Sequence, residues 1–163
     1  MVRQPADSLP KTESGATGDD NFLDGRRLLL VEDNEINMEV AEELLLLKGM
    51  TVEKAWNGRE AVEAFRNSEP FSFDAILMDM QMPEMNGCEA CSHIRAMSRP
   101  DASGIPVIAV TANAFSEDIA ETVRAGMSAH VAKPIDFAQL YVLLEQLIRQ
   151  YRSKADAPAS PRT

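Results

Sequence analysis

Residues 28–34 read Leu-Leu-Leu-Val-Glu-Asp-Asn, an apolar run that ends in two acids and a helix-capping residue. The run Leu28–Val31 predicts a short strand that is covered on both faces, because apolar and polar residues do not alternate in it. Asn34 is a favourable N-cap, and apolar residues then recur at helical spacing from Ile36 to Lys48. Gly49 is a typical residue just past a helix end. This stretch therefore predicts a strand joined directly to a helix.

The same strand–helix unit recurs along the middle of the chain. The predicted strands cover Leu28–Val31, Thr51–Ala55, Phe73–Met78, Pro106–Val110 and Ala129–Ala132. The helices predicted to follow them cover Ile36–Lys48, Gly58–Asn67, Gly87–Met97, Ser116–Ala125 and Phe137–Tyr151. Repeated βα units imply right-handed crossovers and a parallel sheet with helices on both faces. Five such units predict an α/β fold of the flavodoxin-like, doubly wound (βα)5 class, whose five strands lie in the order 2-1-3-4-5.

Two segments of different composition flank these units. Residues 1–27 and 152–163 are rich in Pro, Gly, Ser and Asp and poor in large apolar side chains, which predicts a flexible linker and a flexible tail. The domain is then expected over residues 28–151. That range holds 20 acidic and 9 basic residues, so the folded part is more acidic than the whole chain, whose net charge is −10.

The acidic charge and the apolar pattern exclude several classes of protein. Nucleic acids and anionic membranes both favour a basic surface, so we expect neither as a direct partner. No apolar run approaches the roughly 18 residues that a membrane span requires. One disulfide between Cys88 and Cys91 could not stabilise a domain of this size. So few cysteines predict a protein of the reducing cytoplasm. We interpret both cysteines as small helix residues, since no second pair of metal ligands accompanies them.

Functional groups gather where the predicted strands end. In a doubly wound sheet the ligand lies beyond the carboxyl ends of the strands, so these ends define the candidate site. The groups found there are three acids, a hydroxyl and an ammonium, supplied by Glu32, Asp33, Asp79, Thr111 and Lys133. Three carboxylates packed together repel unless a cation joins them, and an oxygen-only cluster suits Mg²⁺ better than Zn²⁺. Asp79 is then the best candidate for a nucleophile that accepts a phosphoryl group.

Four motifs resemble the receiver domain of two-component response regulators. They are Leu-Val-Glu-Asp-Asn-Glu-Ile-Asn at 30–37, Leu-Met-Asp-Met-Gln-Met-Pro at 77–83, Val-Thr-Ala-Asn at 110–113 and Ala-Lys-Pro-Ile at 132–135. The resemblance covers residues 28–151. The residues of the first two motifs are most similar to those of receivers in hybrid sensor histidine kinases.

The resemblance implies a role for each matching residue. Asp79 matches the phosphorylated aspartate, and the metal ligands match Glu32, Asp33, Asp79 and the backbone carbonyl of Gln81. Thr111 and Lys133 match the pair that contacts the phosphoryl group. The position of an inward-turning Tyr or Phe is occupied here by His130, which makes Thr111 and His130 the expected switch residues. A histidine fills a similar space but also gains charge near neutral pH.

The resemblance also implies partners and a place in signalling. We expect Mg²⁺ as cofactor, a histidine kinase or other phosphohistidine donor, a histidine phosphotransfer protein as a further partner, and a monomer or weak dimer. The isolated domain is expected to catalyse its own phosphorylation and dephosphorylation without being an enzyme in the ordinary sense. Its parent chain is expected to be a hybrid histidine kinase, which can itself be anchored in a membrane.

Three other functions are compatible with parts of the pattern. A stand-alone single-domain response regulator would use the same site. A haloacid-dehalogenase-like phosphatase also uses an aspartyl nucleophile, but it needs an acid two residues further on, where this chain has Gln81. A docking module that acts without phosphorylation would not need Mg²⁺.

Overall fold

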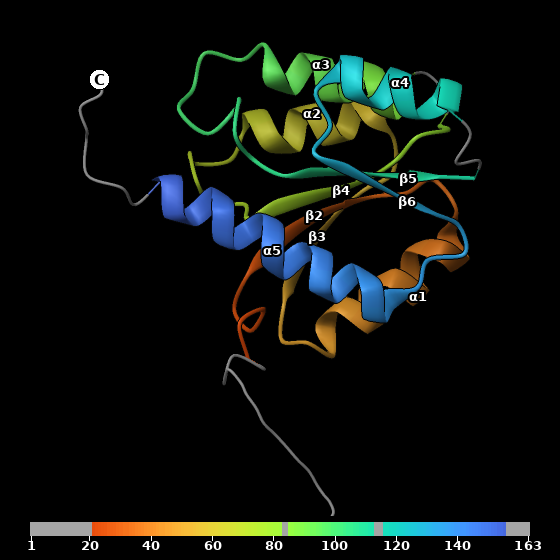
Figure 1. The fold of residues 1–163 in the computed structure, drawn as a ribbon, viewed down its shortest axis with the longest axis vertical. Helices are drawn as coiled ribbons and strands as arrows, with labels where there is room; N and C mark the ends of the chain where they lie inside the picture. The colour runs from red at the N-terminus through yellow and green to blue at the C-terminus, as the bar shows by residue number, and fades with distance from the viewer. Residues whose placement is uncertain (1–20, 83–84, 113–115, 156–163) are drawn as a thin grey trace, which may run out of the picture.

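The computed structural model describes residues 21–82, 85–112 and 116–155, and within them strands and helices alternate (Figure 1). The elements are β2 (Arg27–Val31), α1 (Glu35–Leu46), β3 (Thr51–Ala55), α2 (Gly58–Arg66), β4 (Ala75–Asp79), α3 (Gly87–Arg95), β5 (Val107–Thr111), α4 (Ser116–Ala125), β6 (Ala129–Ala132) and α5 (Phe137–Ala155). The predicted succession of βα units is confirmed. Of the predicted tails 1–27 and 152–163, residues 1–20 and 156–163 lie outside the described residues, as do Pro83 and Asn113 of the quoted motifs. Residues 152–155 continue α5, where Arg152 pairs with Asp74.

The five strands form one parallel sheet in the order β3-β2-β4-β5-β6. Numbered along the chain, this is the predicted order 2-1-3-4-5, so the flavodoxin-like doubly wound class is confirmed. β2 and β4 lie side by side in the middle of the sheet, with Val31 opposite Met78. The residues that follow these two strands therefore meet at the same edge.

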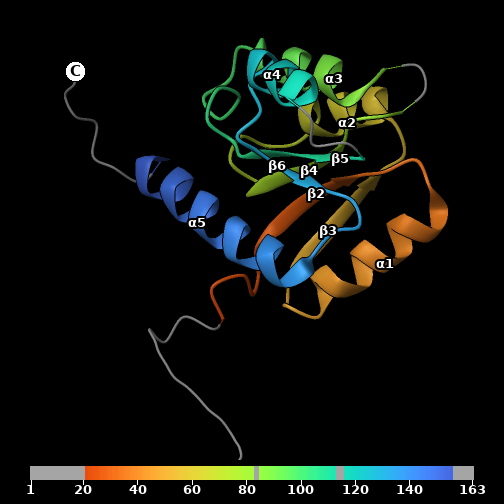
Figure 2. The same ribbon diagram turned by 45° about the vertical axis from the view of Figure 1, so that its right-hand side comes forward.

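Helices cover both faces of the sheet, with α1 and α5 on one face and α2, α3 and α4 on the other (Figures 1 and 2). Because side chains alternate along a strand, β2 sends Leu28 and Leu30 to the α1–α5 side and Leu29 and Val31 to the other. Each set is buried in its own apolar cluster. This double burial explains why the central strands are continuous apolar runs.

Asparagine side chains mark the starts of three helices. Asn34, Asn57 and Asn86 each accept a hydrogen bond from the backbone N–H three residues later. Asn86 forms a full capping box with Glu89. These caps satisfy N–H groups that have no partner inside a helix, and they fix where each helix leaves the edge of the sheet.

The longest helix, α5, has 19 residues and runs from the edge of the sheet after β6 toward its opposite end (Figure 2). The Tyr141 hydroxyl donates to the Leu44 carbonyl at 2.7 Å and so joins α5 to α1. Among the residues that the structure describes, none of the helices is both long and apolar enough to cross a membrane.

Residues 21–26 pack against the domain, although the composition predicts a linker up to residue 27. Leu23 is buried in the α1–α5 cluster, and the Phe22 ring lies 4.3 Å and 4.1 Å from the guanidinium carbons of Arg26 and Arg149. The Gly25 N–H donates to the Gly49 carbonyl at 2.8 Å. One buried leucine and an aromatic ring between two cations thus hold a segment whose average composition is polar.

Two buried aspartates are paired with arginines at the end of the sheet opposite the acids. The Arg99 guanidinium donates to both carboxylate oxygens of Asp101, at 2.7 Å and 3.0 Å, while Arg152 donates to Asp74 at 2.7 Å. Asp101 also accepts the Phe71 N–H at 2.8 Å. Each acid therefore has a charged partner in the folded state, and its negative charge is neutralised there.

We predict that Asp101→Asn destabilises the fold in a pH-dependent way. Burial works against ionisation of Asp101, but the hydrogen bonds from Arg99 and the Phe71 amide outweigh it and hold its pKa below the ordinary value of 3.8. A carboxyl whose pKa is lowered by folding stabilises the fold above its unfolded pKa and loses that contribution as the pH falls through its folded pKa. The free energy of unfolding, measured by urea denaturation, should drop by about 3 kcal/mol at pH 7.

The difference between Asp101→Asn and the parent chain should shrink as the pH is lowered below 3.8. The matched control is Glu145→Gln, which removes the acid of the exposed Glu145–Arg149 pair and should change the free energy of unfolding by less than about 0.5 kcal/mol. Equal effects of the two variants would contradict the prediction.

Candidate functional site

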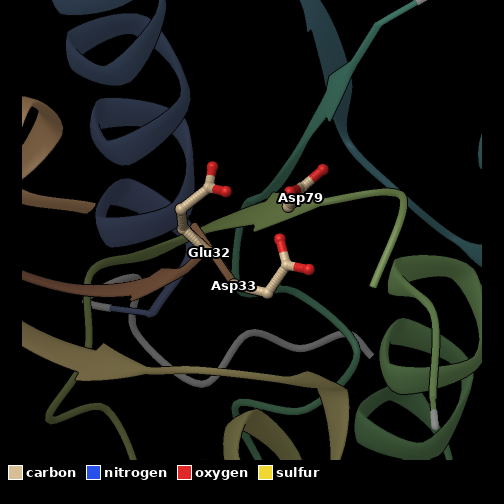
Figure 3. Close-up of side chains that lie close together, drawn as sticks. All are labelled: Glu32, Asp33 and Asp79. Carbon is tan, nitrogen blue, oxygen red and sulfur yellow. The ribbon is translucent and has the colours of Figure 1, made fainter. Parts of the chain in front are cut away.

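Three carboxylates converge where β2 and β4 end, as Figure 3 shows. Glu32 and Asp33 follow β2 directly, and Asp79 is the last residue of β4. One oxygen of each carboxylate lies within 4.8 Å of an oxygen of the other two. Glu32 and Asp79 are 7% and 2% exposed, whereas Asp33 faces solvent. The parallel sheet thus places like charges together at one partly buried point.

Lys133 reaches into this cluster from the segment after β6. Its ammonium Nζ lies 3.3 Å from Asp79 Oδ2 and 3.8 Å from Glu32 Oε1. The lysine side chain is 31% exposed, so solvent screens part of this attraction. With three carboxylates and one ammonium, the cluster retains two negative charges when all groups are ionised, which equals the charge that a divalent cation neutralises.

Backbone amides orient the two buried acids. The Gln81 N–H donates to Asp79 Oδ1 at 3.2 Å, and the Asn34 N–H donates to Glu32 Oε2 at 3.1 Å. Each acid therefore has one oxygen held by an amide and one directed to Lys133. This arrangement limits the rotation of both carboxylates before any ligand arrives.

The pKa of Glu32 is raised above its ordinary value of 4.5. Burial is the largest cause and the Asp79 charge adds to it, while the Asn34 amide and the Lys133 ammonium oppose it. A raised pKa means that ionised Glu32 costs free energy in this environment. The cluster is therefore short of positive charge, and binding of a cation would relieve that shortage.

Thr111 and Lys133 are brought together by the pairing of β5 with β6. Thr111 is the last residue of β5, is 5% exposed and lies opposite Ala132. The Lys133 N–H donates to the Thr111 carbonyl at 2.8 Å, which continues the ladder past the end of β6. The Lys133 ammonium therefore reaches Asp79, and Thr111 ends the strand next to β4, while the predicted phosphoryl-contacting role of this pair stays a prediction.

His130 lies within β6, two residues before the end of the strand. It is paired with Ala109 on β5, two residues before Thr111, and its side chain is exposed. Alternation along parallel strands puts His130 and Thr111 on the same face of the sheet, the one that α4 covers. The predicted switch role of this pair is not tested by the arrangement and stays a prediction.

The close approach of α3 to Asp79 is a feature that sequence reasoning missed. A Cβ atom at Gly87, the first residue of α3, would come within 2.5 Å of the Asp79 carbonyl oxygen. The Asn86-Gly87 dipeptide signals a turn in the sequence, but nothing in it indicates which strand the glycine touches. Gly87 thus lets α3 begin directly against the strand that carries Asp79.

The donor set fits magnesium. The clustered side chains offer carboxylate oxygens, and within the described residues no histidine or cysteine joins the group. Hard, oxygen-only ligand sets with room for water suit Mg²⁺, whereas Zn²⁺ prefers nitrogen or sulfur. Glu32, Asp33 and Asp79 are the side chains that could hold the ion.

Comparison with known proteins identifies the family. The model of the response regulator receiver domain matches residues 28–145, which is most of the chain. The chain therefore belongs to the response regulator receiver domain family of two-component signalling. The parallel five-stranded sheet and the acids at its edge agree with this assignment.

The curated relatives are histidine kinases much longer than this chain. Probable histidine kinase 6 of Oryza sativa subsp. japonica is 35% identical over 144 residues, which cover 78% of this chain and 15% of that protein. Hybrid signal transduction histidine kinase I of Dictyostelium discoideum is 34% identical over 128 residues, which cover 77% of this chain and 7% of that protein. The chain thus matches a small part of each relative.

Solved receiver domains are similar to this chain in fold. The receiver domain of sensor histidine kinase PA1611 from Pseudomonas aeruginosa PAO1 is 37% identical, with a TM-score of 0.70 over 77% of this chain and 98% of that one. That structure contains a magnesium ion coordinated in the active site cleft. The chemotaxis protein CheY4 of Vibrio cholerae is 26% identical, with a TM-score of 0.69.

We predict that Gly87→Ala disturbs the site through the backbone of Asp79. The added methyl group would meet the Asp79 carbonyl oxygen at 2.5 Å, so the start of α3 or the end of β4 must shift. The free energy of unfolding should fall by about 1–3 kcal/mol, the usual cost of overpacking, despite the better helix propensity of alanine.

The matched control for Gly87→Ala is Gly104→Ala, whose added methyl group would lie at an ordinary 3.6 Å from the Tyr151 ring. This control should leave the free energy of unfolding within about 0.5 kcal/mol of the parent value. If thermal denaturation gave both variants the same stability, the close approach of α3 to Asp79 would not constrain the site.

Proposed function

We propose that this receiver domain accepts a phosphoryl group on Asp79 from a phosphohistidine, with Mg²⁺ held by Glu32, Asp33, Asp79 and the backbone carbonyl of Gln81. The observation that carries the proposal is the environment of Asp79. Its carboxylate is nearly buried, is gripped by the Gln81 amide and lies 3.3 Å from the Lys133 ammonium. A carboxylate nucleophile of this kind needs positioning and neutralisation of the phosphoryl charge more than any further chemical group.

The transfer is a displacement at phosphorus. A carboxylate oxygen of Asp79 forms the new O–P bond, the N–P bond of the donor phosphohistidine breaks, and its electron pair stays on the imidazole nitrogen. Hydrolysis later returns the carboxylate and releases inorganic phosphate, with water supplying the oxygen. The transfer starts from the Asp79 carboxylate and the hydrolysis from its acyl phosphate, so both steps take place at the same side chain of this domain.

Lys133 and Thr111 would hold the transferred group. The ammonium that now pairs with Asp79 and Glu32 would pair with a phosphoryl oxygen, and the Thr111 hydroxyl would donate a hydrogen bond to another. A bound magnesium ion would neutralise further phosphoryl charge. The Lys133 N–H bond to the Thr111 carbonyl keeps the two groups on one side of Asp79.

The surroundings of the site favour a protein as the donor. On the first turns of α1, beside Glu32 and Asp33, Ile36 is 70% and Val40 is 48% exposed. A cavity of about 490 Å³ lies between α1 and the segment after β6, and Val40, Ile135 and Phe137 line it together with Lys133. Exposed apolar side chains next to a charged site suit the surface of another protein better than a small phosphate ester.

We propose further that the domain belongs to a phosphorelay in a hybrid sensor histidine kinase, with a histidine phosphotransfer protein as a second partner. The similarity to receiver regions of long histidine kinases supports this origin. Phosphorylation would act through Thr111 and His130 to change the face formed by α4, β6 and α5. The proposed location is the cytoplasm, where phosphorelay donors act.

We predict that Asp79→Asn abolishes labelling by radioactive acetyl phosphate in the presence of Mg²⁺, because the amide is a poor nucleophile of nearly the same shape. The control is Glu35→Gln, which removes an exposed acid on the first turn of α1 and should label like the parent chain. Labelling is measured on denaturing gels. Undiminished labelling of Asp79→Asn would remove Asp79 from the proposed role.

We predict that Lys133→Met separates metal binding from phosphoryl transfer. Removing the ammonium leaves the acids with more negative charge, so Mg²⁺ should bind about fivefold tighter in calorimetric titrations, equivalent to roughly 1 kcal/mol. Phosphoryl labelling should fall, since the phosphoryl oxygens lose their cation.

The counterpart is Asp33→Asn, which should weaken Mg²⁺ binding and labelling together, because it removes a carboxylate from the cluster. A loss of Mg²⁺ affinity in Lys133→Met would show that the lysine helps to build the metal site rather than to hold the phosphoryl group.

A further inference from the structure

A second cavity lies at the end of the sheet opposite the acids. It has a volume of about 570 Å³, within the range of small-molecule sites. Its walls come from the segments before β4, β5 and β6 and from the last turns of α5, which reach this end in Figure 2. The lining residues are Phe71, Pro100, Ser103, Gly104, Pro106, Ser128, Leu147, Gln150, Tyr151 and Lys154.

One wall of this cavity is an aromatic residue held in a strained conformation. Phe71 has a φ of +67°, which is unusual and unfavourable for a bulky L residue. Its N–H donates to Asp101 Oδ2 at 2.8 Å and its carbonyl accepts from Arg152 Nη2 at 2.7 Å. Two charged side chains therefore clamp the backbone on both sides and hold the ring against Tyr151, with 6.0 Å between centroids.

The opposite wall is one face of α5. Leu147, Gln150, Tyr151 and Lys154 follow helical spacing, so they line the cavity together. Tyr151 is 7% exposed, and its hydroxyl has no hydrogen-bond partner among the described residues. Burial, with Asp101 adding to it, raises the pKa of Tyr151 to about 12, so the phenol stays protonated. Because the hydroxyl oxygen itself is fully buried, Tyr151 contributes its ring to the cavity wall and not a hydrogen-bond donor.

The charge around the cavity favours an anion. Lys154 is the one charged residue among the described residues that line it. The nearest buried acids, Asp74 and Asp101, are already paired with Arg152 and Arg99. The hydroxyls of Ser103 and Ser128 add neutral donors to the lining. The apolar part of the lining combines two aromatic rings and two prolines with Gly104 and Leu147.

From these contacts we infer that the cavity at the far end of the sheet binds a small aromatic carboxylate, with its ring against Phe71 and Tyr151 and its carboxylate toward Lys154. The hydrogen bonds that hold Phe71 prepare the apolar wall, and the Lys154 ammonium provides the positive charge that the acid requires. The site is separate from the phosphoacceptor and does not depend on the proposed function.

The inference is tested with 2-naphthoate as the probe and the full chain labelled with ¹⁵N. Binding at about millimolar concentration is the expected range for a ligand of this size. The amide signals of Phe71, Gly104, Ser128 and Tyr151 should shift together along one saturable curve, and those of Glu32 and Asp33 should not move. The neutral analogue 2-naphthamide should bind about threefold more weakly, as expected for loss of one exposed charge contact.

Variants identify the contacts. Lys154→Gln should reduce the affinity for 2-naphthoate to that for 2-naphthamide. Lys48→Gln should not change it, because Lys48 follows α1 and lies over the Tyr141 ring, away from the cavity lining. Phe71→Gly removes the ring while favouring the positive φ, so the chain should fold and bind roughly tenfold more weakly. Gly104→Val should block the cavity.

The inference would be overturned by three results. Absence of shifts at saturating probe would show that the cavity is not a ligand site. Shifts that persist in Gly104→Val and Phe71→Gly would place the probe elsewhere. Equal binding of acid and amide in both the parent chain and Lys154→Gln would exclude a carboxylate as the preferred ligand. Asp79→Asn should bind the probe like the parent, which keeps this test distinct from the labelling experiment.

Discussion

The repulsion between carboxylates at one edge of the sheet is the constraint on which the site depends. Glu32 and Asp79 are held close together, and burial together with the Asp79 charge raises the pKa of Glu32. The sheet enforces this contact, because β2 and β4 are neighbours and their ends lie at the same level. A single ammonium, that of Lys133, offsets part of the charge. The folded chain thus leaves an excess of negative charge at this edge, which a divalent cation can neutralise.

At the opposite end of the sheet, each buried acid is paired with an arginine. Asp74 and Asp101 each have an arginine partner, and Asp101 forms a bidentate pair with Arg99. A fully paired acid stabilises the fold but has no free capacity for an added cation. The contrast between an unbalanced cluster at one edge and balanced pairs at the other separates the reactive end of this receiver domain from the end that secures its framework.

The contacts of α1 and α5 show how the framework extends to the surface. Leu45 is buried on the inner face of α1, whereas the side chains of Leu46 and Leu47 are 49% and 78% exposed. Residues 21–26 pack at the same end of α1, where Leu23 enters the apolar cluster. These features give α1 two functions in the fold: its inner face closes the core, and its first turns present Ile36 and Val40 beside the acids.

Much of the fold could be predicted because its signals are local. The apolar run Leu28–Val31, the cap Asn34 and the glycine Gly49 each act within a few residues, and their repetition determines the class of sheet and its strand order. The same order places Glu32, Asp33, Asp79, Thr111 and Lys133 at one edge, so the composition of the candidate site followed from the chain alone. The predicted strands end at Met78 and Val110, whereas β4 includes Asp79 and β5 includes Thr111. The strands are longer because the hydrogen bonds between β4 and β5 continue from the Met80 N–H to the Val110 carbonyl.

The tertiary structure alone decided which distant residues touch. Gly87 lies against the Asp79 carbonyl, Arg152 pairs with Asp74 across 78 positions of the chain, and Phe71 is clamped in a left-handed conformation. Such contacts depend on how helices settle on the sheet, and no periodicity or propensity encodes them. The sequence by itself therefore determined the fold class and the chemical groups of the site. The distances between those groups, and the second cavity, depended on packing between segments far apart in the chain.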